Sequence, residues 1–508
     1  MSTKKIIFFS FIISLLFKPL WLFNNTNLGQ PADDMYHWFH SATLAIDQDI
    51  DYTDDYNIQN ATVNELTNVP SAPPGAGYLS SVFVFLFSFF DDSELIKAEE
   101  FRLNPTKSFS YLGFFIAGMF YTFFSFYLLK KIISKNKYST IILFCTFLST
   151  LVHFVTTRFL MPHAVEFFLC SLILYLFEHN KQKKLNNFNI TILLISYFFL
   201  SLTRPSTFLY TIILFLIYRD RLKFEIKNFT IISPILLIFI FSYTKISNLL
   251  YSENYMFLNT YGSDMDAYTS TINIEQIILG IIKLPNLFLS SSMGVIWSTP
   301  IVFFGLLSFF KEYFSKKNIN LNSFLYFIYF AGSSAPLLIW QGREVAYGQR
   351  LLIGILPICI LFVSRNIENF NFIKLLIYPI TAITYIGYLF FYSSSKLTLF
   401  KGVTLWGTTV GFVGQNYYIE LVKGVLNIEN IISVLLRNIY SVNFFKFVNL
   451  ENLLLSFPNL NNFSSGKVNK FISFASTYQE LSVNYLFIAT AAIFTFSILF
   501  AKLIIEQD

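Results

Sequence analysis

Long apolar blocks alternate along the chain with shorter polar segments. Most blocks run for about 14 to 23 residues, close to the length that a helix needs to cross a bilayer. Twelve of them are predicted to be membrane-spanning helices: 6–23, 108–129, 138–155, 162–178, 188–203, 206–218, 228–247, 296–310, 321–339, 351–364, 373–392 and 482–503. This pattern predicts an all-α polytopic membrane protein with about twelve transmembrane helices.

Composition and charge agree with that class. Hydrophobic residues make up 54% of the 508 positions and charged residues only 13%, whereas soluble domains carry roughly 25% charged residues. The net charge of +6 comes mainly from Lys and Arg in short loops between apolar blocks, which is the positive-inside pattern. We therefore expect membrane lipids, and no nucleic acid, as partners. Cys145, Cys170 and Cys359 all fall inside apolar blocks, where they are expected to be buried small residues.

One further apolar block, 77–90, decides the topology. If it crossed the membrane, the basic loops after residues 129, 178, 218 and 310 would all lie outside, against the positive-inside rule. We therefore predict that it is an interfacial helix on the outer surface. The block 6–23 lacks a small-residue cleavage site and is expected to remain as the first helix.

With that assignment both termini are cytoplasmic. The outer segments are 24–107, 156–161, 204–205, 248–295, 340–350 and 393–481. The short inner loops are basic and the long outer ones are polar, so chemistry is expected on the periplasmic or outer face of the cytoplasmic membrane. No GxxxxGK[ST] motif occurs, which argues against an ATP-driven pump subunit.

The first outer loop is acidic, and its first acidic residues are the pair Asp33-Asp34, about ten residues beyond the predicted membrane edge. Residues 36–46 are predicted to form a short amphipathic helix, with the pair at its N-terminus, where carboxylates complement the helix dipole. Near the membrane the pair could take a proton from a hydroxyl, or bind a divalent cation such as Mg²⁺ or Mn²⁺. The simpler interpretation is helix capping and solvation, which we favour for the acids in 47–55. His37 and His40 are expected to be packing or rim residues.

Three segments resemble the GT-C superfamily of membrane glycosyltransferases, which includes protein O-mannosyltransferases and lipid A aminoarabinose transferases. The first is the run DDMY at 33–36, followed by a Pro/Gly turn, PPGAGY, at 73–78. The second is NTYGSDMDAYTS at 259–270, followed by LPNLFLSSSMGVIWSTP at 284–300. The third is WQGREVAYGQRLLIGILP at 340–357. The similarity runs in patches from about residue 1 to 365 and lies on the predicted outer side.

The resemblance implies transfer of a sugar from a polyprenyl-phosphate donor to a lipid, glycan or protein acceptor. It implies that Asp33 or Asp34 is the catalytic base and that arginines bind the donor phosphate. The candidate phosphate-binding residues are Arg158, Arg204, Arg343 and Arg350. Tyr36, Trp340 and Gly348 are the candidate substrate-binding residues. Apart from a cation held by the two aspartates, no cofactor is expected.

These candidates also have structural interpretations. Arginine at a membrane edge is often an interfacial anchor. Arg204, in a two-residue turn with Pro205, must stay at the boundary or face the bundle interior, and an ionisable residue so placed is a functional hypothesis. Glu166, near His163 in a predicted span, is interpreted as half of a structural pair with a neighbouring helix.

The chain divides into a catalytic module at 1–392, an outer helical segment at 393–481, and a last helix with a cytoplasmic tail at 482–508. The middle segment is expected to be an interfacial cap, or to cover the site or hold the acceptor. Three other functions remain open. A transporter or flippase of lipid-linked glycans would predict inverted repeats and polar residues at the bilayer midplane. A polysaccharide polymerase or ligase would not be expected to carry the early acidic pair. A non-catalytic subunit would not need that pair.

Overall fold

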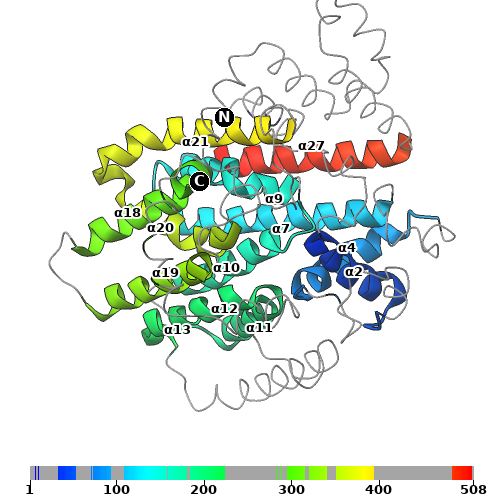
Figure 1. Ribbon diagram of the computed structural model, residues 1–508, viewed down its shortest axis with the longest axis horizontal. Helices are drawn as coiled ribbons and strands as arrows, with labels where there is room; N and C mark the ends of the chain where they lie inside the picture. The colour runs from blue at the N-terminus through cyan, green and yellow to red at the C-terminus, as the bar shows by residue number, and fades with distance from the viewer. Residues whose placement is uncertain are drawn as a thin grey trace, which may run out of the picture.

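The computed structural model describes most of a helical bundle. The described residues are 32–52, 72–92, 108–156, 158–179, 184–222, 294–314, 320–339, 350–393 and 483–505, together with the single residues 6, 10, 70, 278, 282 and 288. Every regular element within these ranges is helical. Figure 1 shows α7 (Phe109–Ile133) running through the middle of the molecule, with α2 (Ala32–Ala42) and α4 (Gly75–Ser88) together at one end.

The remaining elements follow in chain order. They are η2 (Thr43–Asp47), α8 (Ser139–Thr146), η4 (Phe147–Leu151), α9 (Val152–Thr156), α10 (His163–Glu178), α11 (Asn187–Thr203), α12 (Pro205–Thr211), α13 (Ile213–Ile217) and η5 (Arg219–Arg221). The later ones are α17 (Val295–Ser298), α18 (Pro300–Phe314), α19 (Leu321–Ile339), η6 (Arg350–Ile355), α20 (Leu356–Asn366), η7 (Ile367–Asn369), α21 (Asn371–Ser393) and α27 (Val483–Ile505).

The described helices coincide with the apolar blocks of the sequence. Three are long and apolar enough to cross a membrane, namely Phe109–Ile133, Ser139–Thr156 and Arg350–Asn369. These three helices support the expectation of a membrane protein; the full set of twelve spans stays a prediction. The block 228–247 lies outside the described residues, as does the segment 393–481 except for Ser393 and the block 6–23 except for Ile6 and Ser10.

Helix α7 is the central element because small residues let its neighbours approach closely. A Cβ added at Gly113 would stand 2.6 Å from the carbonyl oxygen of Phe83 on α4. Close approach through small residues is a common way for apolar helices to associate in membranes. The helix begins at Ser108, whose hydroxyl caps it by accepting from the Tyr111 amide at 3.1 Å.

Helix α4 covers most of the apolar block 77–90, on which the predicted topology depends. One face packs on α2 and α7 through buried residues that include Ala76, Ser80 and Val84. The opposite face exposes five apolar side chains at the spacing of one helical stripe: Val82, Phe85, Leu86, Phe89 and Phe90. A helix packed on the protein by one face and apolar on the other has the form expected of an interfacial helix.

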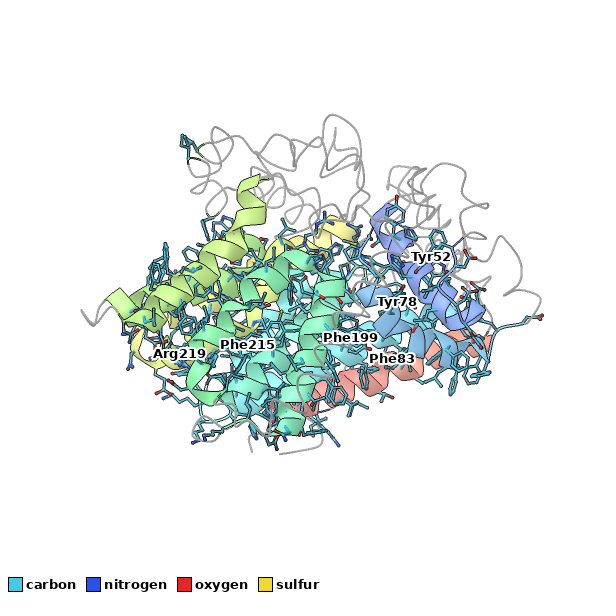
Figure 2. All side chains as sticks on the ribbon, turned by 90° about the horizontal axis from the view of Figure 1, so that it is seen from below. Tyr52, Tyr78, Phe83, Phe199, Phe215 and Arg219 are labelled. Atoms are coloured by element: carbon cyan, nitrogen blue, oxygen red, sulfur yellow. The ribbon has the colours of Figure 1, made fainter. Side chains whose placement is uncertain are left out.

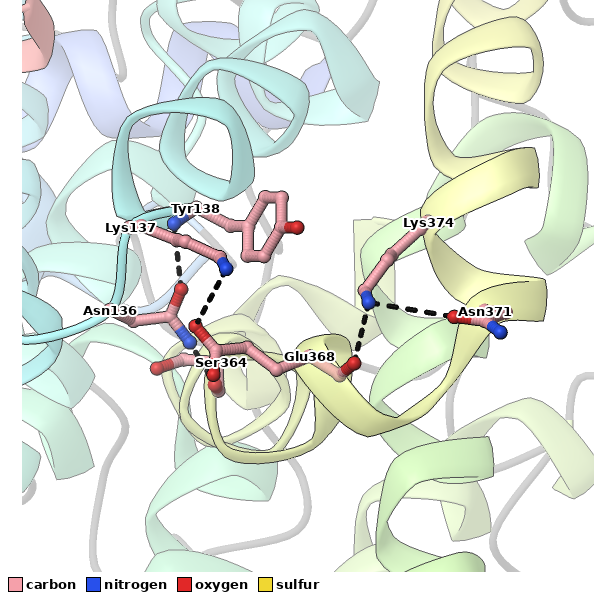
Figure 3. Close-up of polar contacts among 7 residues, drawn as sticks. All are labelled: Asn136, Lys137, Tyr138, Ser364, Glu368, Asn371 and Lys374. Atoms are coloured by element: carbon pink, nitrogen blue, oxygen red, sulfur yellow. Dashed lines mark hydrogen bonds and ion pairs between the residues drawn. The ribbon is translucent and has the colours of Figure 1, made fainter.

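One end of the bundle is closed by contacts among loops that the sequence assigned to the cytoplasmic side. In Figure 3 the loop between α7 and α8 meets the region around η7, where Lys137 lies 3.9 Å from the Glu368 carboxylate. Asn136 donates to the Ser364 carbonyl, and Lys374 donates to the Glu368 carbonyl at 2.5 Å. These loops were predicted to share one side, and the structure brings them together.

Further contacts at that end join helices that are distant in sequence. Arg365, near the end of α20, forms an ion pair of 3.1 Å with the buried Glu178 at the end of α10. Tyr218, next to η5, donates to the same carboxylate. Lys130 donates to the Leu503 carbonyl on α27 at 2.5 Å. Figure 2 shows Arg219 in this part of the molecule and Tyr52 and Tyr78 in the part formed by α2 and α4.

Candidate functional site

The first member of the site is an ion pair between α2 and the turn before α10. Asp34 stands in the first turn of α2, and Arg158 lies between α9 and α10. Both Nε and Nη2 of Arg158 lie 3.0 Å from Oδ2 of Asp34. The two side chains are only 12% and 10% exposed, so the pair is largely shielded from water. Charge-assisted hydrogen bonds of this kind are among the strongest that side chains make.

A second carboxylate, Glu166, lies one turn into α10 and is completely buried. Its Oε2 is 3.0 Å from Nδ1 of His163, and its Oε1 accepts from the Thr207 hydroxyl at 2.5 Å. Nε of Arg204 lies 3.7 Å from the same Oε2. Glu166 therefore joins α10 to the start of α12, in agreement with its interpretation as a structural pair with a neighbouring helix.

Arg204 reaches Glu166 because the chain breaks between α11 and α12. Its backbone is extended (φ −153°, ψ 90°), and Pro205 begins the next helix, where its missing N–H costs no hydrogen bond. The Arg204 side chain is buried. Of the two positions that the sequence allowed, the boundary or the bundle interior, the structure shows the interior.

A third arginine, Arg350, opens η6, which packs against α10. The charges of Arg204, Arg350 and Arg158, and the ring of His37, all interact electrostatically with His163. The following turn reaches the cluster through Gly354. A Cβ added there would stand 2.6 Å from Cγ2 of Thr207 and 2.8 Å from Oε1 of Glu166. Only a residue without a side chain fits at that position.

The described members of the cluster carry an excess of positive charge. They include three guanidinium groups, on Arg158, Arg204 and Arg350, and two carboxylates, on Asp34 and Glu166. Low-dielectric surroundings strengthen the attraction of such a group for an anion. The N-terminus of α10, whose helix dipole favours negative charge, begins at His163 in the same place. This arrangement is suited to a phosphate or pyrophosphate group.

A separate buried network fixes α2 in place. Nδ1 of His40 lies 2.6 Å from the Tyr52 hydroxyl, and its Nε2 lies 2.8 Å from the Ala72 carbonyl oxygen. The Tyr52 hydroxyl is in turn 3.3 Å from that of Tyr78 on α4. Burial lowers the pKa of His40 to about 3 and raises the pKa of Tyr78 to about 12, so both are neutral at ordinary pH. His40 is thus a packing residue that locates the helix carrying Asp34.

Of the residues singled out in the sequence, Asp34, Arg158, Arg204 and Arg350 belong to one cluster. Tyr36 is buried in α2. The Asp33 backbone is in the first turn of α2, but its side chain lies outside the described part, as do Trp340, Arg343 and Gly348. Sequence reasoning missed Thr207, a hydroxyl residue inside an apolar block, where the only signal is its position three residues after Arg204.

The metal hypothesis concerns the carboxylates of Asp33 and Asp34, and the side chain of Asp33 lies outside the described residues. Among the described residues, no group of three or more His, Cys, Asp or Glu side chains is arranged to hold a metal ion. Oδ2 of Asp34 lies 3.0 Å from Nη2 of a cation, Arg158, and a positive neighbour disfavours a second one. A metal ion held by the two aspartates stays a prediction.

Comparisons of the chain with protein-family models, curated proteins and solved structures gave no match. The fold and the cluster on their own define the class. Over the described ranges the protein is all-helical, three of its helices are apolar enough to cross a membrane, and a shielded, basic polar site lies at the end of the bundle near α2.

Proposed function

We propose that this protein is a membrane glycosyltransferase of the GT-C type. It moves a sugar from a polyprenyl-phosphate donor to a lipid, glycan or protein acceptor on the outer face of the cytoplasmic membrane. The proposal includes twelve spans with both termini in the cytoplasm. The observation that carries it is the convergence of Asp34, from the first outer loop, with Arg158, Arg204 and Arg350 from three other parts of the chain.

The arginines suit the donor's phosphate. Guanidinium groups bind phosphate through paired N–H donors, and here they lie where water is largely excluded. As the bond between the anomeric carbon and the phosphate oxygen breaks, the phosphate leaves with the electron pair and gains negative charge. Arg158 and Arg350 stabilise that charge, and Arg204 contributes from its buried position beside Glu166.

Asp34 is the proposed base. An acceptor hydroxyl attacks the anomeric carbon through an oxocarbenium-like transition state, and its proton passes to the Asp34 carboxylate. In the structure Oδ2 of Asp34 is engaged with Arg158, which weakens the carboxylate as a base. A donor phosphate competes for Arg158 and so releases Asp34 when the donor is bound. Binding of the donor and activation of the base are thereby coupled.

The test is an assay of sugar transfer in membranes that contain the protein. Radiolabelled polyprenyl-phosphate hexoses, N-acetylhexosamines and pentoses are supplied, and release of sugar from the lipid carrier is followed. Asp34→Asn and Asp33→Asn are compared with Asp49→Asn, an exposed acid of the same loop. We expect the parent to transfer one sugar class, Asp49→Asn to match the parent, and Asp34→Asn to be inactive at normal abundance. An inactive parent, or full activity of both Asp33→Asn and Asp34→Asn, contradicts the proposal.

A further inference from the structure

The proposed sugar transfer assigns no role to the imidazole of His163, which belongs to the same cluster. The side chain is completely buried. One ring nitrogen, Nδ1, meets Oε2 of Glu166 at 3.0 Å. The other, Nε2, has no hydrogen-bond partner in the described part of the chain. Buried polar atoms in native proteins are nearly always hydrogen-bonded, so a buried nitrogen without a partner needs an explanation.

The surroundings hold this ring in one orientation. The other oxygen of Glu166 accepts from Thr207, so the carboxylate is fixed on both sides. The Phe154 ring packs edge-on against the imidazole, with 4.3 Å between the ring centroids. A carboxylate at Nδ1 places the ring proton there and leaves Nε2 of the neutral ring with a lone pair. The structure thus presents a preoriented hydrogen-bond acceptor.

The location of His163 shows what such an acceptor would meet. Arg204, Arg350 and Arg158, the proposed phosphate-binding residues, all act electrostatically on the ring. Nε of Arg204 lies 3.7 Å from Oε2 of Glu166, the oxygen that meets Nδ1 of His163. A group bound beside the donor phosphate is the sugar itself, which offers hydroxyl groups as donors. The lone pair of Nε2 accepts a hydrogen bond from a hydroxyl, whereas a phosphate oxygen has no proton to donate.

We propose that His163 is a sugar-binding residue, whose Nε2 accepts a hydrogen bond from a hydroxyl of the donor sugar, and that Glu166 is its positioning residue. This inference rests on the proposed function. It adds to that function the residue by which the protein distinguishes a donor that carries a sugar from polyprenyl phosphate alone. Exposure is 12% and 10% at the Arg158 and Asp34 side chains and falls to 0% at His163 and Glu166.

The test compares two ligands in the transferase assay. One is the polyprenyl-phosphate sugar that the parent uses, and the other is polyprenyl phosphate without sugar, supplied as a competitive inhibitor. His163→Phe keeps a ring against Phe154 but removes both nitrogens. We expect kcat/KM for the sugar donor to fall by roughly tenfold to a hundredfold, as for loss of a buried hydrogen bond. The inhibition constant of the bare lipid phosphate should stay within about twofold of the parent value.

Two further variants complete the design. His179→Phe, an exposed histidine just beyond the opposite end of α10 that stacks on Tyr175, should match the parent in both measurements. Glu166→Gln presents an N–H to Nδ1 and so moves the ring proton to Nε2. Like His163→Phe, this variant should lower kcat/KM for the sugar donor and leave the inhibition constant of the bare lipid phosphate nearly unchanged. It replaces His163→Phe if that variant fails to accumulate.

The outcomes separate the inference from the function on which it rests. An active parent with unchanged kcat/KM in folded His163→Phe or Glu166→Gln overturns the role of His163 and leaves the transferase in place. Equal weakening of the sugar donor and the bare lipid phosphate also overturns it, because the loss then does not depend on the sugar. A parent that transfers no sugar from any polyprenyl-phosphate donor overturns both.

Discussion

Arg158 directs two of its nitrogens, Nε and Nη2, at a single oxygen of Asp34, each at 3.0 Å. The pair joins the first turn of α2 to the turn before α10, across 124 residues of sequence. Because Arg158 has further N–H groups, a second anion can begin to bind it and then compete with Asp34 for the guanidinium. The ion pair thus has both a structural part in holding α2 and a proposed part in sensing the donor phosphate.

The contribution of the Asp34–Arg158 ion pair to the free energy of unfolding can be measured with a double-mutant cycle. Asp34→Asn and Arg158→Gln should each lower the free energy of unfolding by roughly 3 kcal/mol, because each leaves a shielded charge without its partner. The double variant should be more stable than the sum of the two losses predicts, with a coupling of about 1–3 kcal/mol. Denaturant titration of the detergent-solubilised protein measures all four forms. Additive losses would show that the two side chains do not interact in the folded protein.

Glu166 should be far more important for stability than a surface carboxylate. Glu166→Ala leaves the buried Arg204 and the Thr207 hydroxyl without their partner, so we expect a loss of about 3–5 kcal/mol. The matched control is Glu368→Ala, which breaks the exposed ion pair with Lys137 and should change stability by less than about 1 kcal/mol. Thermal unfolding of the two variants against the parent gives the comparison. Equal shifts of the melting temperature in the two variants would mean that the Glu166 network contributes no more to stability than a surface ion pair.

Two glycines test how closely the helices around the site must pack. A Cβ at Gly77 would stand 2.5 Å from Cβ of His40 and 2.7 Å from the His37 carbonyl oxygen, so Gly77→Ala should separate α4 from α2. Overpacking of this kind costs roughly 1–3 kcal/mol. At Gly118 the added Cβ would meet only Cβ of Ala164 at 3.9 Å, an ordinary contact. Gly118→Ala should therefore fold and unfold like the parent. The prediction is wrong if the two substitutions have the same effect on the melting temperature.

His40 should make stability depend on pH in the mildly acidic range. Burial lowers its pKa from 6.5 to about 3, so the unfolded chain binds a proton at His40 more readily than the folded one. Its contribution is fully present above pH 6.5 and is lost as the pH falls toward 3. Between pH 7.5 and pH 5 the loss should be about 2 kcal/mol. His40→Gln keeps a hydrogen-bonding side chain and removes this titration, so the difference in stability between variant and parent should shrink over that range. A difference independent of pH would contradict the assignment of a neutral, buried His40.

Much of the architecture could be predicted from the sequence because long apolar blocks have few alternatives to helix. The block 108–129 corresponds to α7, which ends four residues beyond Leu129, at Ile133, in a basic last turn with Lys130 and Lys131. The break at Arg204 and Pro205 also follows from local chemistry, since proline cannot continue a hydrogen-bonded helix. Contacts such as Lys137 with Glu368 agree with the sidedness that loop charges predicted.

The partners within the site could not be predicted in the same way. Charge and topology placed Asp34 and Arg158 on one side, but which arginine would meet which carboxylate depends on how the helices pack. The same holds for Thr207, whose hydroxyl binds Glu166 from 41 residues away. Polar residues in apolar blocks carry no local signal of their partners, because helix propensity and hydropathy describe only the face on which a residue lies.

The central claim, that Asp34 is the base of a donor-binding arginine cluster, is tested most directly by measuring donor binding and sugar transfer together in Asp34→Asn. The arginines remain in this variant and Arg158 is no longer held by a carboxylate. It should therefore bind the polyprenyl-phosphate sugar at least as tightly as the parent, while the transfer rate falls by roughly 10²–10⁴-fold. Transfer at the parent rate by a folded Asp34→Asn protein would contradict the account.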